Sequence, residues 1–220
     1  MHYSTEKNNH GLPHDPFKAI VSPRPIGWIG TKSKDGILNL APYSFFNAIS
    51  DKPYYVTFSS SNYKDSLKNI EDTGEFTTSV VSEKLFEHMN NSSVTADPKI
   101  NEFELANLNV SYGRYVKAPY VSEAPAALEC KLWKVIDLPN CDREKGTGNY
   151  LIIRKVLGIY INDNFIIDGL LDINSIRPIV RLGYMDYGVV GKENLFTKNR
   201  PVLDENGMLK EIKSWDGKYK

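Results

Sequence analysis

The chain has 220 residues, of which 41% are hydrophobic and 25% charged, as in an ordinary soluble globular protein. Its 27 basic and 27 acidic residues balance, and a nucleic-acid-binding protein would need a basic face. No apolar run approaches the roughly 20 residues that span a bilayer, and the polar N-terminus lacks the apolar core of a signal peptide. We therefore expect a cytoplasmic protein with neither nucleic acid nor membrane as a partner.

Strand patterns dominate the first 81 residues. Short β-branched or aromatic runs predict strands at 18–22, 26–31, 37–40, 54–59 and 76–81. Turn residues separate them, at Asp35-Gly36, Asp51-Lys52-Pro53 and Thr73-Gly74. Short strands at hairpin spacing favour a barrel over alternating βαβ units.

Helices are predicted between the two groups of strands. Asp65 or Ser66 caps a first helix that ends at Gly74, and Ser82 caps a second. Asp97, followed by proline, caps a third, short helix. We expect an extended loop over 109–125, then strands at 126–136, 150–161 and 165–167, the last two joined by a turn at 162–164.

The chain carries no internal repeat and no low-complexity linker, which favours one domain. We expect a flexible N-terminal tail over 1–14, the domain over 15–201 and a peripheral C-terminal extension over 202–220. Cys130 and Cys141 show no CxxC or Cys/His ligand spacing, so we expect no metal site.

The start of the first helix is a candidate phosphate site. Free N–H groups and the helix dipole converge at a helix N-terminus, where Lys64 adds a positive charge. The hydroxyls of Ser61 and Ser66, on either side of Asp65, can donate hydrogen bonds. The same residues also fit an ordinary capped surface helix whose lysine is solvated.

The stretch from Asn39 to Asn47 is the second candidate. Pro42 is expected to break the strand and free nearby donors such as the Ser44 N–H. Tyr43, with the two phenylalanines that follow, supplies aromatic area. An isoalloxazine ring needs such donors in its plane and apolar faces above and below. A bulged edge strand with core aromatics is the alternative.

Four further residues could contribute to a site or be purely structural. Arg24 and Trp28 interrupt an apolar run, and Arg181 and Tyr184 offer a cation and an aromatic ring late in the chain. The common alternatives are unsupported, because the sequence lacks the GxGxxG, GxxxxGK[ST] and GxSxG motifs.

In order along the chain, these motifs resemble the flavin reductase-like, FMN-binding split-barrel family, with the flavoredoxin-type branch as the nearest match. The resemblance covers about 15–201, and is carried by 22–31 (SPRPIGWIGT), 39–47 (NLAPYSFFN), 64–70 (KDSLKNI), 73–76 (TGEF), 122–130 (SEAPAALEC) and 181–187 (RLGYMDY).

The resemblance implies a mainly β protein with peripheral helices, a six-stranded Greek-key split barrel that forms a homodimer with FMN near the subunit interface. It implies that Ser61, Lys64, Asp65 and Ser66 hold the phosphate and that 39–44, including Ala41, lines the flavin. Trp28 and Thr31 would lie beside the flavin, with Arg181 and Tyr184 near its open face. The chain departs from the usual pattern at Ser66, Arg154 and Tyr184.

Three functions remain open at this point. The first is an NAD(P)H-dependent FMN reductase, in which hydride passes from the nicotinamide C4 to the flavin N5 without a catalytic side chain. The second is a non-catalytic FMN electron carrier that a partner protein reduces. The third is a flavin-free barrel used as a binding module.

Overall fold

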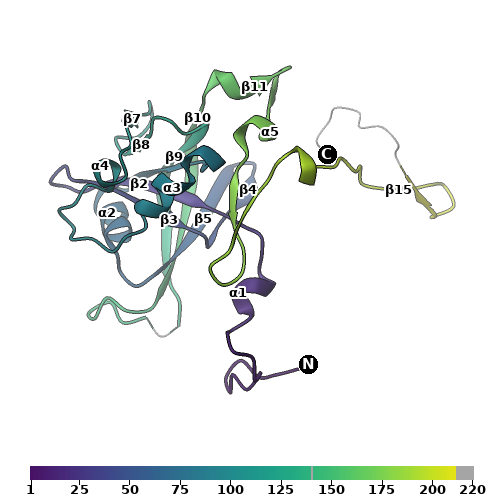
Figure 1. The fold of residues 1–220 in the computed structure, drawn as a ribbon, viewed down its shortest axis with the longest axis horizontal. Helices are drawn as coiled ribbons and strands as arrows, with labels where there is room; N and C mark the ends of the chain where they lie inside the picture. Colours follow the sequence, from purple (N-terminus) through teal and green to yellow (C-terminus); the bar gives the residue numbers. More distant parts are fainter. Residues whose placement is uncertain (140, 212–220) are drawn as a thin grey trace.

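The computed structural model describes residues 1–139 and 141–211. At its centre is an antiparallel sheet of seven strands, whose hydrogen-bonded neighbours follow the order β3-β2-β6-β9-β10-β5-β4 (Figure 1). In that order the strands are Leu38–Tyr43, Gly27–Lys32, Glu75–Ser79, Ala126–Asp137, Asn149–Ile161, Tyr54–Ser61 and Phe46–Asp51.

The sheet curls until its two sides meet. The register between the long strands β9 and β10 shifts between Ile153 and Arg154 and again between Val156 and Gly158, and such bulges bend and twist a sheet. As a result β3, the first strand in the order, also contacts β5, the sixth. The predicted mainly β barrel is confirmed, with β4 as an additional outer strand on β5.

Shorter elements surround the main sheet. Three strands form a second sheet: β1 (Arg24–Pro25), β13 (Ile179–Arg181) and β14 (Tyr187–Val189). The two-stranded pairs are β7 (Val110–Tyr112) with β8 (Pro119–Val121), β11 (Ile166–Ile167) with β12 (Leu170–Leu171), and β15 (Val202–Leu203) with β16 (Leu209–Lys210). The helices are α1 (Phe17–Ile20), α2 (Asp65–Thr73), α3 (Phe86–Asn91), α4 (Glu102–Leu105) and α5 (Ile173–Ile176), with 3-10 turns η1 (Glu83–Leu85), η2 (Asp163–Phe165) and η3 (Lys192–Asn194).

Two apolar clusters form the core, one on each face of β2. Ile29 belongs to the cluster inside the barrel, which α2 covers with Leu67 and Ile70. Trp28, the preceding residue, belongs to the cluster beneath α3 and α4. Successive side chains of a strand point to opposite faces, so a strand buried on both faces reads as a continuous apolar run. This explains why 26–31 was readable as a strand.

One predicted strand is wrong, and another is present but has a different neighbour from the one expected. Residues 18–22 contain the helical turn α1, whose first N–H, on Phe17, donates to Asp15 Oδ1. Strand β11 pairs with β12 instead of with β10, because Asp168 and Gly169 adopt positive φ angles of 51° and 76°. Two such residues between short apolar runs make a two-residue hairpin turn, a signal that sequence analysis missed.

Loop and helix boundaries also differ from the prediction. The expected loop over 109–125 contains the β7–β8 pair. The third helix begins at Glu102 instead of near Asp97, because the side chain of Asn101 accepts the N–H of Phe103 and caps it. The first helix ends at Gly74 as predicted, with a left-handed φ of 75° and an N–H that donates to the Ile70 carbonyl.

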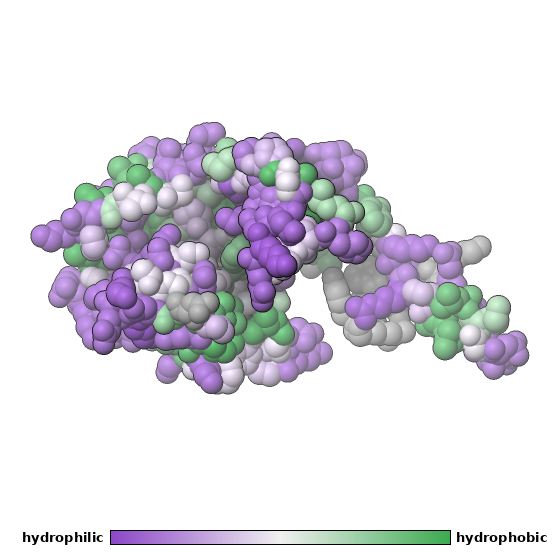
Figure 2. All heavy atoms as spheres, turned by 90° about the horizontal axis from the view of Figure 1, so that it is seen from below, coloured by the Kyte–Doolittle hydropathy of each residue, from purple (hydrophilic) through white to green (hydrophobic). Residues whose placement is uncertain are grey.

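The last described segment leaves the body of the protein. The β15–β16 hairpin lies apart from the main sheet (Figure 1), and Figure 2 shows it as an arm beside a body of mixed polar and apolar surface. Residues 212–220, the remainder of the expected C-terminal extension, lie outside the described residues.

Candidate functional site

A cavity of about 430 Å³ opens where β3 ends and α2 begins. That volume is within the range of small-molecule sites. Nine of the predicted site residues line it: Asn39, Ala41, Pro42, Tyr43, Ser44, Ser61, Lys64, Asp65 and Ser66. The structure therefore brings the two candidate motifs together into one site.

The N-terminus of α2 forms one wall of this cavity. Lys64, and not Asp65 or Ser66, is the N-cap residue, and no side chain among the described residues caps the helix through a hydrogen bond. The first N–H groups of a helix have no intrahelical partner, and the dipole adds partial positive charge there. The exposed Lys64 adds a full charge, so this wall is suited to an anion.

Asn39 joins the two motifs through hydrogen bonds. Its Oδ1 accepts from Ser66 Oγ at 2.8 Å and from Thr31 Oγ1 at 3.1 Å. Its Nδ2 donates to Glu102 Oε2 at 3.0 Å. Thr31 also accepts from Asn69 Nδ2, at 3.1 Å. Thr31 thus supports the wall from behind instead of lining the cavity.

Two carboxyl groups in the wall are less acidic than usual. Burial raises the pKa of Glu102, against the opposing effect of hydrogen bonds from the Leu40 N–H and Asn39. Burial also raises the pKa of Asp65, which Lys68 partly opposes. When ionised, these two carboxylates repel an anion in the cavity. The positive end of α2 and the charge of Lys64 act in the opposite direction and attract one.

Pro42 does not break strand β3, which corrects the sequence-based expectation. The strand continues to Tyr43, with Pro42 opposite Trp28. The Leu40 N–H points away from β2 and donates to Glu102 Oε2 at 3.0 Å. Alternate residues of a strand direct their N–H groups to the same side, so an N–H at position 42 would also point away from β2. The missing N–H of Pro42 therefore costs no sheet hydrogen bond.

Trp28 lies behind the cavity wall. It is fully buried, and its Nε1 donates to Ser92 Oγ at 2.9 Å. Ser92 begins the segment 92–96, which also lines the cavity. Trp28 therefore positions that segment, in contrast to its predicted place beside the ligand.

The three remaining predicted residues do not line this cavity. Arg24 is buried, donates to the carbonyls of Lys18, Val21 and Leu182, and lies 5.7 Å from the ring centroid of Phe45, which does line it. Arg181 lies over the ring of Tyr187, 4.2 Å from its centroid. Tyr184 lines a second cavity of about 620 Å³, together with residues of the 13–18 segment. Lys18 borders both cavities.

Sequence reasoning missed several residues of the main cavity. They are Lys18, Ser59, Tyr63, Glu102 and the segment 92–96. Only the hydroxyl residues Ser92, Ser93 and Thr95 carried a readable signal. The others reach the site through contacts between distant parts of the chain.

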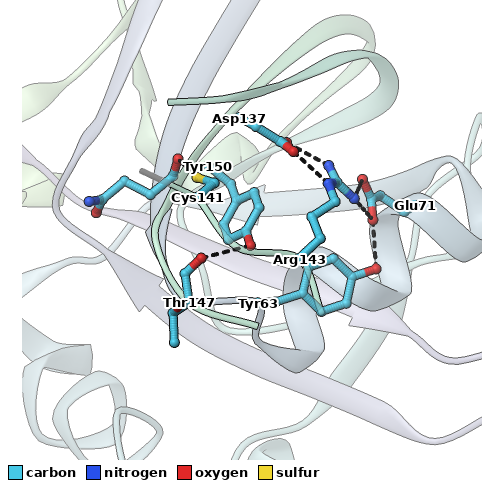
Figure 3. A network of polar contacts seen from close by, with 8 residues as sticks. Tyr63, Glu71, Asp137, Cys141, Arg143, Thr147 and Tyr150 are labelled. Carbon is cyan, nitrogen blue, oxygen red and sulfur yellow. Dashed lines mark hydrogen bonds and ion pairs between the residues drawn. The ribbon is translucent and has the colours of Figure 1, made fainter. Parts of the chain in front are cut away.

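Tyr63 is held in the wall by a polar network (Figure 3). Its hydroxyl donates to Glu71 Oε2 at 2.6 Å, and Arg143 binds Glu71 Oε1 at 3.0 Å. Arg143 also donates twice to Asp137, at 2.6 Å from both Nε and Nη2. Burial and Glu71 raise the pKa of Tyr63 to about 12. The network ties the β9–β10 loop to α2.

Among the described residues, no group of three or more His, Cys, Asp or Glu side chains is placed to hold a metal ion. No helix of the described ranges is long and apolar enough to cross a membrane.

The curled antiparallel sheet, with a pocket at the start of α2, defines a mainly β, barrel-like protein with one candidate small-molecule site. Comparison with known families agrees: residues 21–175 match the model of the flavin reductase like domain. The chain therefore belongs to the flavin reductase-like family.

Relatives and solved structures support this assignment. A protein of Aquifex aeolicus, described only as uncharacterized, is 43% identical over 171 residues, covering 74% of this chain and 83% of its own length. Nitrilotriacetate monooxygenase component B from Bacillus cereus is similar in structure, with a TM-score of 0.79, 25% identity and coverage of 87% of this chain and 96% of its own. Flavoredoxin of Desulfovibrio vulgaris shares the fold, with a TM-score of 0.71, 23% identity and coverage of 81% and 91%.

Proposed function

We propose that the protein binds FMN in the main cavity and acts as a flavin oxidoreductase that uses NAD(P)H as its hydride donor. The observation that carries the proposal is the uncapped N-terminus of α2, which opens beside Lys64 into a cavity that Tyr43, Phe45 and Tyr63 also line. A phosphate ester joined to a flat aromatic ring system matches both halves of that cavity.

The phosphate would bind at the start of α2. The N–H groups of Asp65 and Ser66 and the ammonium of Lys64 supply donors to its oxygens. The carboxylate of Asp65 cannot donate, so that residue would contribute only its backbone. A helix N-terminus stabilises an anion by about 0.3–1 kcal/mol when exposed and by up to about 2 kcal/mol when partly buried.

The ring would lie along the outer edge of β3. The Leu40 N–H on this edge is already taken by Glu102, and Pro42 has none. Ser44 is the next residue whose N–H faces the same way, and we assign it as a donor to the ring system. Tyr43 and Phe45 supply apolar area, and Tyr43 is fixed by its packing on Phe58, 4.4 Å between ring centroids.

Bound flavin would supply the two-electron chemistry, with the nicotinamide as hydride donor. The protein's own residues would bind and orient it. Asn39 holds the β3 edge and the start of α2 in one position. Trp28 holds the segment 92–96 in place through its hydrogen bond to Ser92. Pre-positioned groups of this kind are what a cofactor enzyme contributes.

The test begins with purified protein saturated with FMN under anaerobic conditions. Addition of NADH or NADPH is expected to bleach the oxidised-flavin absorbance. Binding of FMN with no bleaching by either nucleotide would contradict the reductase and support the electron carrier. Failure to bind FMN at all would contradict both and leave the flavin-free binding module.

We also propose that the protein is a homodimer, as the family resemblance implies. Trp133 and Ile159, on the two long strands, are 61% and 54% exposed, and a second subunit would cover such side chains. Light scattering coupled to size exclusion should give twice the mass of one chain, and the mass of a single chain would contradict the proposal.

A further inference from the structure

The barrel interior contains a positive charge that the site described above does not use. Arg154, on β10, is fully buried. Its guanidinium lies between two rings, 3.8 Å from the centroid of Phe76 and 3.9 Å from that of Phe58. None of its Nε, Nη1 and Nη2 atoms has a hydrogen-bond partner among the described residues.

An arginine in this position is unusual. Buried charges are normally paired, because transfer of an ion from water into a protein interior is costly. The nitrogen atoms are also inaccessible to solvent. The two aromatic faces recover part of the lost hydration through cation–π interaction. The field of the charge is therefore screened only by the protein around it.

The titratable groups nearest to Arg154 do not neutralise it. These are Tyr43 on β3 and Cys130 on β9. Burial raises the pKa of both, that of Cys130 to about 12, so both are uncharged at pH 7. Glu129, the other charged residue beside Cys130, accepts the N–H groups of Tyr115 and Val116. Burial lowers the pKa of Arg154 to about 9, which leaves it a cation at neutral pH.

The charge of Arg154 is separated from the main cavity by the rings of Phe58 and Tyr43. Phe58, stacked on Arg154, packs against Tyr43, which lines the cavity. The Tyr43 hydroxyl interacts with the side chains of Ser60 and Ser66. Ser66 belongs to the first turn of α2, where the phosphate is placed above. A chain of contacts through Phe58 and Tyr43 therefore links Arg154, inside the barrel, to the phosphate end of the site.

We propose that Arg154 is a positioning residue whose buried charge draws the phosphate of FMN to the start of α2 without touching it. This inference rests on the proposed function, because it needs FMN in the main cavity. This role also explains why a destabilising side chain occupies the centre of the barrel. The buried charge costs free energy in the apoprotein and stabilises the complex with FMN.

Arg154→Met replaces the charge with an apolar side chain of similar length. We expect two effects of opposite sign. Apoprotein unfolding should move to a higher temperature, by about 3 °C, because an unpaired buried charge is removed. FMN should bind about tenfold more weakly, while riboflavin, which lacks the phosphate, should bind nearly as it does to the wild type.

Lys64→Met is the matched control, because Lys64 is an exposed cation at the same end of the site. Its effect on FMN binding should shrink at 1 M salt, where exposed charges are screened over about 3 Å. The effect of Arg154→Met should persist at 1 M salt. Arg154→Lys, which keeps a cation in the barrel, should retain most of the preference for FMN over riboflavin.

The experiment measures the dissociation constants of FMN and riboflavin for the four proteins at 0.1 M and 1 M salt. A tenfold loss specific to FMN in Arg154→Met, independent of salt, supports the inference. An unchanged ratio of the two constants overturns it while leaving the proposed function intact. Wild-type protein that binds neither flavin overturns the proposed function, and the inference with it. Should Arg154→Met not fold, Arg154→Gln takes its place as a second uncharged variant: a loss specific to FMN supports the inference and an unchanged ratio of the two constants overturns it.

Discussion

The network around Arg143 leads to a prediction about the stability of the protein. Arg143→Ala removes a bidentate ion pair with Asp137, an ion pair with Glu71, and stacking on Tyr63 and Tyr150 at 5.8 Å and 5.4 Å from the ring centroids. The Arg143 side chain is 43% exposed, so water screens each of these interactions. Solvent-exposed ion pairs contribute about 0.2–1 kcal/mol each and exposed cation–π contacts about 0.5–1 kcal/mol.

Because these contributions share one side chain, we expect a loss of about 1–2 kcal/mol in the free energy of unfolding. For a chain of this size that lowers the melting temperature by roughly 2–8 °C. Thermal unfolding followed by circular dichroism measures it, with Arg143→Lys as the control. Lysine keeps the charge but not the bidentate geometry and should lose about half as much. A melting temperature of Arg143→Ala within 1 °C of the wild type would refute this reading of the network.

The remaining predictions concern the walls of the main cavity. Ser66→Ala removes the bond to Asn39 Oδ1 and should weaken FMN binding about fivefold, as measured by fluorescence titration. Asp65→Asn should bind FMN more tightly than the wild type at pH 8. The raised pKa of Asp65 means that the wild-type carboxylate takes up its proton earlier as pH falls, so the two dissociation constants should converge toward acid pH. A constant ratio would contradict that assignment. Trp28→Phe removes the bond to Ser92, and amide hydrogen exchange in 92–96 should accelerate while that of α2 stays unchanged.

Local patterns explain what could be predicted from the sequence. Helix α2 was readable because Leu67 and Ile70 face the core and Gly74 ends the helix. The two halves of the site, 39–44 and 61–66, were readable because each lies within one continuous segment. The resemblance to a family then supplied their order and the barrel.

The rest depends on contacts between segments far apart in the chain. Glu102 reaches Asn39 across 63 positions, and Trp28 reaches Ser92 across 64. Arg24 looked like a site cation, but its guanidinium binds backbone carbonyls that hold the N-terminal turn. A single sequence gives the residue types in such cases but not their partners, so it did not show that Trp28 and Thr31 lie one hydrogen bond behind the cavity wall.

A crystal structure of the protein with FMN would locate the flavin directly. We expect the phosphate within hydrogen-bond distance of the N–H groups at the start of α2 and of Lys64, with the ring along the edge of β3 near Ser44. Flavin bound instead in the cavity lined by Tyr184, or with its phosphate away from α2, would refute the proposed binding site.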